Sequence, residues 1–201
     1  MTGIKNIIFD LGGVLVGFDS RRSIDAFSRL GCEKVAEYVR EHRTEDLFYR
    51  IELGQSNTQD FCAEVRQMTA TKASDEAIIA AWNALLTPVT PERKQRLIEL
   101  RQSGIRLFLL SNTNDMHWQL CSSQLEGCFE RVFLSYEMQL AKPNPEIFSE
   151  VLRRADIDAR ETLFIDDNAD NIAAAQSLGI QTFHNQAIDD WLLQLPNSCN
   201  S

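Results

Sequence analysis

The sequence predicts an α/β fold in which helices cover a parallel sheet, with a separate helical module inserted after the first strand. Short apolar runs alternate with helical periodicity from about residue 90 to 183, which is typical of a parallel sheet with right-handed crossovers. From about residue 18 to 86 the periodicity is helical, with almost no strand signal. The 201 residues are enough to bury a core without disulfides.

The first strand is the apolar run Ile7-Ile8-Phe9, which ends in Asp10 and two glycines. An apolar run bounded by turn residues is typical of a strand buried on both faces. In such sheets, chemistry gathers just beyond the carboxyl ends of the strands. Asp10 therefore stands where a nucleophile would, although this segment alone equally fits an Asp that caps a turn.

The inserted module should form an all-helical cap. Asn57 and Ser74 precede apolar periodic runs and are expected to be N-caps. Helices are expected at 20–30, 33–49, 58–69 and 74–85.

The remainder should build the sheet. Thr90 and Pro91 begin a helix that Gly104 ends. Further strands are expected at 105–110, 131–134, 162–165 and 180–183. The predicted organisation is an α/β core (1–17 and 88–195), a helical cap (18–87) and a disordered tail (196–201).

The composition of the chain argues against several classes of partner and structural site. With 29 acidic and 20 basic residues the formal charge is −9, which argues against a nucleic-acid partner. The five cysteines lack the spacing of a disulfide framework or a zinc site. No leader or membrane-spanning run is evident, so we expect a soluble, cytoplasmic protein without a membrane partner. Nothing indicates the oligomeric state.

Polar motifs follow the later strands as well. Ser111 and Asn112 end one strand, Asp166 and Asp167 end another, and Lys142-Pro143 lies between them. Parallel strands would bring Asp10, Ser111 and the Asp pair to one edge. Taken alone, these residues also fit helix caps and an exposed lysine. In this order and on these strand ends, the motifs resemble the haloacid dehalogenase superfamily, in particular its sugar-phosphatase-like members with a helical cap, such as glucose 1-phosphate phosphatases.

The resemblance covers Ile7 to about Phe183 and implies a Rossmann-like core, a bound Mg²⁺ and a small phosphorylated substrate. Mg²⁺ prefers hard oxygen ligands and would offset the repulsion between a carboxylate nucleophile and a phosphate. The implied roles are nucleophile and metal ligand for Asp10, metal ligands for the Gly12 carbonyl and Asp167, phosphate binding for Ser111 and Asn112, charge balance for Lys142, and support of the site for Asp166 (or a further ligand) and Asn171.

Gly12 departs from the family pattern, because most phosphatases of the family carry a second Asp there as the general acid and base. Such help is typically worth about 10²–10⁴-fold in rate. Three interpretations remain: a substrate with a good leaving group, such as a sugar 1-phosphate; a replacement acid from the cap; or a binding or regulatory protein without turnover. Candidate replacements are Asp19, His42, Glu45 and Asp46.

A metal-independent 2-haloacid dehalogenase would also lack the second Asp. The Asp166-Asp167 pair argues against it, because that reaction has no use for paired carboxylates beside the nucleophile. A phosphomutase is disfavoured because it needs a reversible acid. We therefore expect a Mg²⁺-dependent phosphatase that acts through an aspartyl-phosphate intermediate.

Overall fold

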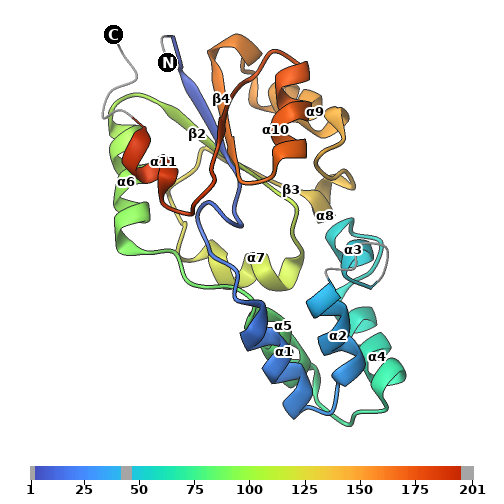
Figure 1. The fold of residues 1–201 in the computed structure, drawn as a ribbon. Coiled ribbons are helices and arrows are strands. Elements are labelled where there is room, and N and C mark those ends of the chain that lie inside the picture. Colours follow the sequence, from blue (N-terminus) through green and yellow to red (C-terminus); the bar gives the residue numbers. More distant parts are fainter. Residues whose placement is uncertain (1–2, 42–46, 196–201) are drawn as a thin grey trace.

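The computed structural model describes residues 3–41 and 47–195, which form a parallel sheet with helices on both faces and a helical cap at one end (Figure 1). The sheet order is β3-β2-β1-β4-β5, and all neighbouring strands are parallel. The predicted α/β fold is confirmed. The strands are β1 (Asn6–Phe9), β2 (Arg106–Ser111), β3 (Arg131–Leu134), β4 (Thr162–Asp166) and β5 (Gln181–His184).

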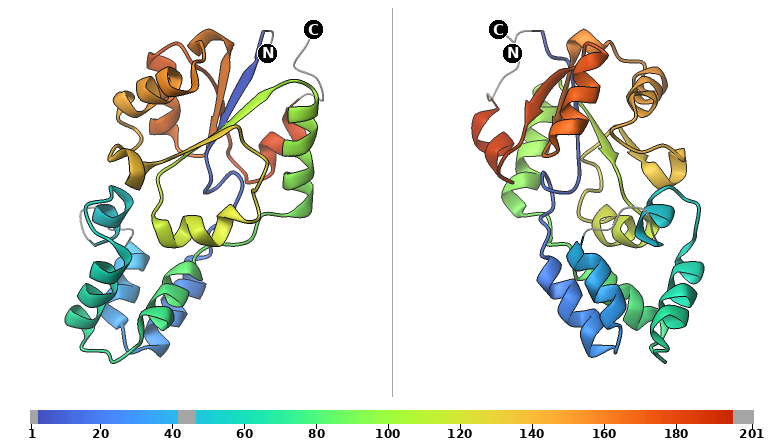
Figure 2. Two further views of the ribbon diagram at one scale, coloured as in Figure 1. Left: turned by 180° about the vertical axis from the view of Figure 1, so that it is seen from behind. Right: turned by 45° about the vertical axis from the view of Figure 1, so that its right-hand side comes forward.

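The strands alternate their side chains between two apolar layers. Ile7 and Phe9 of β1 pack in a cluster with Trp191, whereas Ile8 packs in a second cluster with Phe148. Helices α6 and α11 cover the first face of the sheet, and α9 and α10 cover the second (Figure 2). These helices are α6 (Pro91–Gln102), α9 (Pro145–Ala155), α10 (Ala169–Ser177) and α11 (Asp190–Gln194).

The cap contains five helices in the described part of the chain: α1 (Ser20–Arg29), α2 (Glu33–Glu41), α3 (Leu47–Glu52), α4 (Thr58–Thr69) and α5 (Asp75–Asn83). The side chains of Asn57 and Ser74 accept hydrogen bonds from the backbone of α4 and α5, as N-caps do. Over 33–49, where one helix was expected, the structure has α2 and then α3, which continues to Glu52. Residues 42–46, between them, lie outside the described part.

The cap packs on the core through α7 (Asp115–Ser122). The Trp82 ring stacks on Phe48, with ring centroids 4.4 Å apart, and also on His117 of α7, with centroids 4.7 Å apart. Met116 of α7 also belongs to the buried cluster of the cap. A core helix thus completes the apolar interior of the cap.

Two antiparallel chain segments connect core and cap. The Thr87 amide donates to the Gly17 carbonyl at 2.9 Å, and the Asp19 amide donates to the Leu85 carbonyl at 2.8 Å. Phe18 lies between these bonds, at the entrance to the cap. No helix within 3–41 and 47–195 is long and apolar enough to cross a bilayer.

Candidate active site

Asp10 lies at the centre of the sheet edge. Phe9 is in register with Ile165 of β4, and the Asp10 amide donates to the Ile165 carbonyl at 2.9 Å. Asp10 therefore leaves the sheet level with Asp166, while Ser111 ends β2 on its other side. The strand order reverses between β1 and β4, which is where ligands bind in open parallel sheets.

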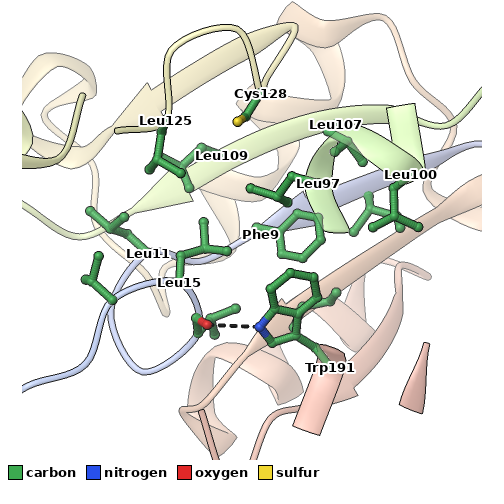
Figure 3. Close-up of a cluster of buried hydrophobic side chains, with 14 of the residues drawn as sticks. Phe9, Leu11, Leu15, Leu97, Leu100, Leu107, Leu109, Leu125, Cys128 and Trp191 are labelled. Atoms are coloured by element: carbon green, nitrogen blue, oxygen red, sulfur yellow. Dashed lines mark hydrogen bonds between the residues drawn. The ribbon is translucent and has the colours of Figure 1, made fainter. Parts of the chain in front are cut away.

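The loop after Asp10 is held by residues near the C-terminus. The Trp191 indole donates to the Val14 carbonyl at 2.9 Å (Figure 3), and its ring lies edge-on to Phe9. The side-chain Nδ2 of Asn185 donates to the Gly13 carbonyl at 2.9 Å. Each such bond contributes about 0.5–1.5 kcal/mol. Sequence reasoning missed both residues, because neither belongs to a recognisable motif.

Lys142 joins the two aspartates. Its Nζ lies 2.7 Å from Asp10 Oδ1 and 2.6 Å from Asp166 Oδ2, and it also donates to the Leu110 carbonyl. The lysine side chain is 1% exposed. A lysine this deeply buried is paired, so the interpretation of Lys142 as an ordinary exposed lysine is wrong.

Asn112 positions Lys142 rather than facing outward. Its Nδ2 donates to the Lys142 carbonyl at 2.8 Å, and its Oδ1 accepts from the Lys142 amide at 2.9 Å. This reciprocal pair ties the end of β2 to the segment that carries the lysine. The side chain of Asn112 therefore has a positioning task that the sequence did not indicate, and the phosphate-binding role expected for Asn112 stays a prediction.

Asp166 is fully buried and saturated with hydrogen bonds. Besides the ion pair with Lys142, it accepts from Asn171 Nδ2 at 3.0 and 3.1 Å and from the Asn168 amide at 2.8 Å. Asn168 is also the N-cap of α10. Asn168 thus caps a helix. Asp166, in the same segment, is held in the site by Lys142 and Asn171.

The carboxylates crowd one another. Ligand oxygens of Asp10, Asp166 and Asp167 all lie within 4.8 Å of one another. Burial raises the pKa of Asp10 to about 7, with Lys142 opposing and Asp166 reinforcing the rise. Burial and the neighbouring Asp166 raise the pKa of Asp167 too. Burial alone would lower the pKa of Lys142, but its ion pairs with Asp10 and Asp166 outweigh that effect and raise it.

Gly12 is covered by an aromatic ring. A Cβ at Gly12 would lie 2.1 Å from Cζ of Phe18 and 2.6 Å from Cε2 of the same ring. Phe18 is 57% exposed, so its ring is an apolar surface at the mouth of the site. Ser111, Gly12 and Phe18 line a small hollow of about 60 Å³.

A larger cleft of about 570 Å³ opens beside Lys142. Tyr49 and Glu52 of α3 line it from the cap, and Asn171 lines it from the core. Glu52 also lines the small hollow beside Gly12. Sequence reasoning missed Glu52, because nothing distinguishes it from the other charged residues of the cap helices.

Of the replacement acids expected from the sequence, only Asp19 lies within the described residues. Asp19 lies at the N-terminal end of α1 and is not among the described residues that line either hollow. His42, Glu45 and Asp46 fall outside the described residues.

Comparison with known proteins gives the family. A model of the haloacid dehalogenase-like hydrolases matches residues 4–179. The chain belongs to this family. The resemblance inferred from the four motifs is confirmed, and the chain is an enzyme of the hydrolase class.

Full-length relatives of this haloacid dehalogenase-like hydrolase include phosphatases. It is 30% identical to D-ribitol-5-phosphate phosphatase from Bacteroides thetaiotaomicron, over 98% of this chain and 100% of that protein. A haloacid dehalogenase family enzyme from the same organism, in complex with magnesium and inorganic phosphate, superposes with a TM-score of 0.90 at 38% identity, covering 96% of this chain and all of that one. A predicted hydrolase of the family from Porphyromonas gingivalis gives 0.85 at 30% identity, over 97% and 100%.

Proposed function

We propose that this enzyme is a Mg²⁺-dependent phosphatase for a small phosphorylated polyol or sugar, and that Asp10 forms an aspartyl-phosphate intermediate. The observation that carries the proposal is the buried contact between Lys142 and Asp10 within a cluster of three carboxylates. A relative named for the hydrolysis of D-ribitol 5-phosphate and a structural neighbour with magnesium and phosphate support it.

The carboxylate cluster fits a divalent cation. Three carboxyl groups share one lysine, and burial together with the neighbouring Asp166 raises the pKa of Asp10. All the donors are hard oxygens, which Mg²⁺ prefers. Asp10, Asp167 and the Gly12 carbonyl would hold the ion, with Asp166 as a neighbour. When bound, the ion would offset the negative charge of the carboxylates and stabilise the charge on the phosphoryl oxygens.

The side chains of the site then have distinct tasks. The Asp10 carboxylate attacks phosphorus as the ester P–O bond breaks, and water later attacks the same phosphorus to release phosphate and free Asp10. Lys142 stays charged throughout and compensates the charge that gathers between nucleophile and phosphate. Ser111 and the backbone beyond it would donate hydrogen bonds to phosphoryl oxygens. Asn112 and Asn171 keep Lys142 and Asp166 in place.

The test is Asp10→Asn, assayed with Mg²⁺ on a panel of phosphorylated polyols, sugars and aryl phosphates. We expect turnover to fall by at least about 10³-fold, because an amide is not a nucleophile, while circular dichroism stays unchanged. Full activity of Asp10→Asn would contradict the covalent mechanism. Activity that persists in excess EDTA would point to a metal-independent hydrolase such as a dehalogenase. If the wild type releases no phosphate from any ester of the panel but binds a phosphorylated ligand tightly, the protein would be a binding protein rather than a phosphatase.

A further inference from the structure

The Phe18 ring lies against Gly12, the position that lacks the acid found in most phosphatases of the family. The ring occupies the space into which any side chain at position 12 would begin, because its Cζ lies 2.1 Å from the point that a Cβ would take. An alkoxide leaving group still needs a proton when the ester bond breaks, and the attacking water still needs a base. In this enzyme, the proton must therefore reach the leaving oxygen from another element.

The titratable side chains that line the two hollows differ in whether they are able to transfer a proton. His117 lines the small hollow, but it is buried against Trp82, and burial lowers its pKa to about 4. It is therefore neutral at neutral pH, and its ring nitrogens face Asn114 and the Trp82 carbonyl. Lys142 is committed to Asp10 and Asp166.

Of the two hollows, Asp170 and Tyr49 line only the larger cleft. Among the described titratable residues, Glu52 alone lines both this cleft and the hollow that contains Gly12 and Ser111. Its backbone is also anchored to the core, because Ser135 Oγ donates to the Glu52 carbonyl at 2.6 Å. The end of α3 is thereby held at the boundary between cap and core.

We propose that Glu52 is the catalytic acid and base of this enzyme, supplied by the cap in place of a second Asp. The proposal rests on the phosphatase function proposed above. In the first step, the Glu52 carboxyl gives its proton to the ester oxygen as the P–O bond breaks and the bond from Asp10 to phosphorus forms. In the second step, the Glu52 carboxylate takes a proton from water as the water oxygen bonds to phosphorus and the Asp10–phosphorus bond breaks.

The test compares two classes of ester. One substrate is the alkyl phosphate that the wild type hydrolyses fastest, whose leaving group needs a proton. The other is p-nitrophenyl phosphate, whose leaving group is stable as an anion. Glu52→Gln retains the backbone bond to Ser135, and Glu37→Gln, on the exposed side of α2, is the matched control.

We expect Glu52→Gln to lower kcat on the alkyl phosphate by about 10²–10⁴-fold. On p-nitrophenyl phosphate, the pre-steady-state burst of nitrophenolate should keep a rate within about threefold of the wild type, while the following turnover slows. Glu37→Gln should resemble the wild type on both esters. An equal loss in the burst and on the alkyl ester, or no loss on either, would overturn the role of Glu52. A wild type that hydrolyses neither ester would overturn the phosphatase function itself.

Discussion

Gly13 lies directly against the carboxylate of Asp167. A Cβ at Gly13 would be 2.2 Å from Asp167 Oδ2 and 2.4 Å from its Cγ, and the backbone there has a φ of +68°. The absence of a side chain thus lets the loop after β1 and the segment after β4 approach closely. The two proposed metal-binding segments meet at this contact.

Gly13→Ala should weaken magnesium binding, because the new methyl group must displace Asp167. Gly31→Ala is a matched control, since Gly31 has a similar φ of +70° but a Cβ added there would have nothing within 4 Å. Both variants carry similar backbone strain, of about 1–2 kcal/mol. We expect the Mg²⁺ concentration for half-maximal phosphate release to rise at least about tenfold in Gly13→Ala only. Equal Mg²⁺ dependence of the two variants would count against Asp167 as a ligand.

Lys142→Met should abolish activity and destabilise the fold. It leaves Asp10 and Asp166 without their buried cation, and removing one partner of a buried ion pair typically costs about 3–5 kcal/mol. The Lys5–Glu161 pair is exposed, so Lys5→Met should change the free energy of unfolding by less than about 1 kcal/mol. Urea unfolding without metal measures both variants. A Lys142→Met enzyme as stable and active as Lys5→Met would refute the assigned role.

The effect of Gly12→Asp on the free energy of unfolding should depend on whether the Phe18 ring is present. Introduced alone, the new side chain must push the Phe18 ring out of its position, whereas in a Phe18→Ala background the space is already open. We expect the two substitutions to be non-additive, with an interaction energy of about 0.5–3 kcal/mol in the free energy of unfolding. A double-mutant cycle measured by urea unfolding tests this coupling. Additivity within about 0.5 kcal/mol would show that the ring does not occupy this space.

His117 should make the fold sensitive to acid. Burial lowers its pKa from 6.5 to about 4, so the unfolded chain takes up a proton at a higher pH than the folded protein does. The stabilisation is therefore present above pH 6.5 and is lost as the pH falls toward 4. At about 1.4 kcal/mol for each pKa unit, the loss amounts to roughly 3 kcal/mol.

His117→Gln should remove this part of the pH dependence. Its free energy of unfolding should fall less steeply than that of the wild type between pH 6.5 and 4, measured by urea unfolding at each pH. Carboxylates that titrate in the same pH range are present in both proteins, so the difference between the two curves reports on His117. Parallel curves for the two proteins would mean that His117 is not buried in its neutral form.

Much of the site could be predicted from the sequence because its signals are local. The run Ile7-Ile8-Phe9 is apolar at every position, which predicted a strand buried on both faces with Asp10 just beyond its carboxyl end. The same reasoning placed Ser111 and Asp166 at the ends of other strands, on the same edge of the sheet. The cap helices beginning at Asn57 and Ser74 were predictable because capping depends on adjacent residues.

By itself, the sequence determined the parallel sheet, the order of the strand-end motifs and the family. Only the tertiary structure decided that Phe18 covers Gly12, that Asn112 holds Lys142 across 30 residues of chain, and that Glu52 borders both hollows. Periodicity and capping arise from neighbouring residues, so they can be read along the chain. Contacts between cap and core depend on how two packed units meet, and no local pattern of residues encodes that arrangement.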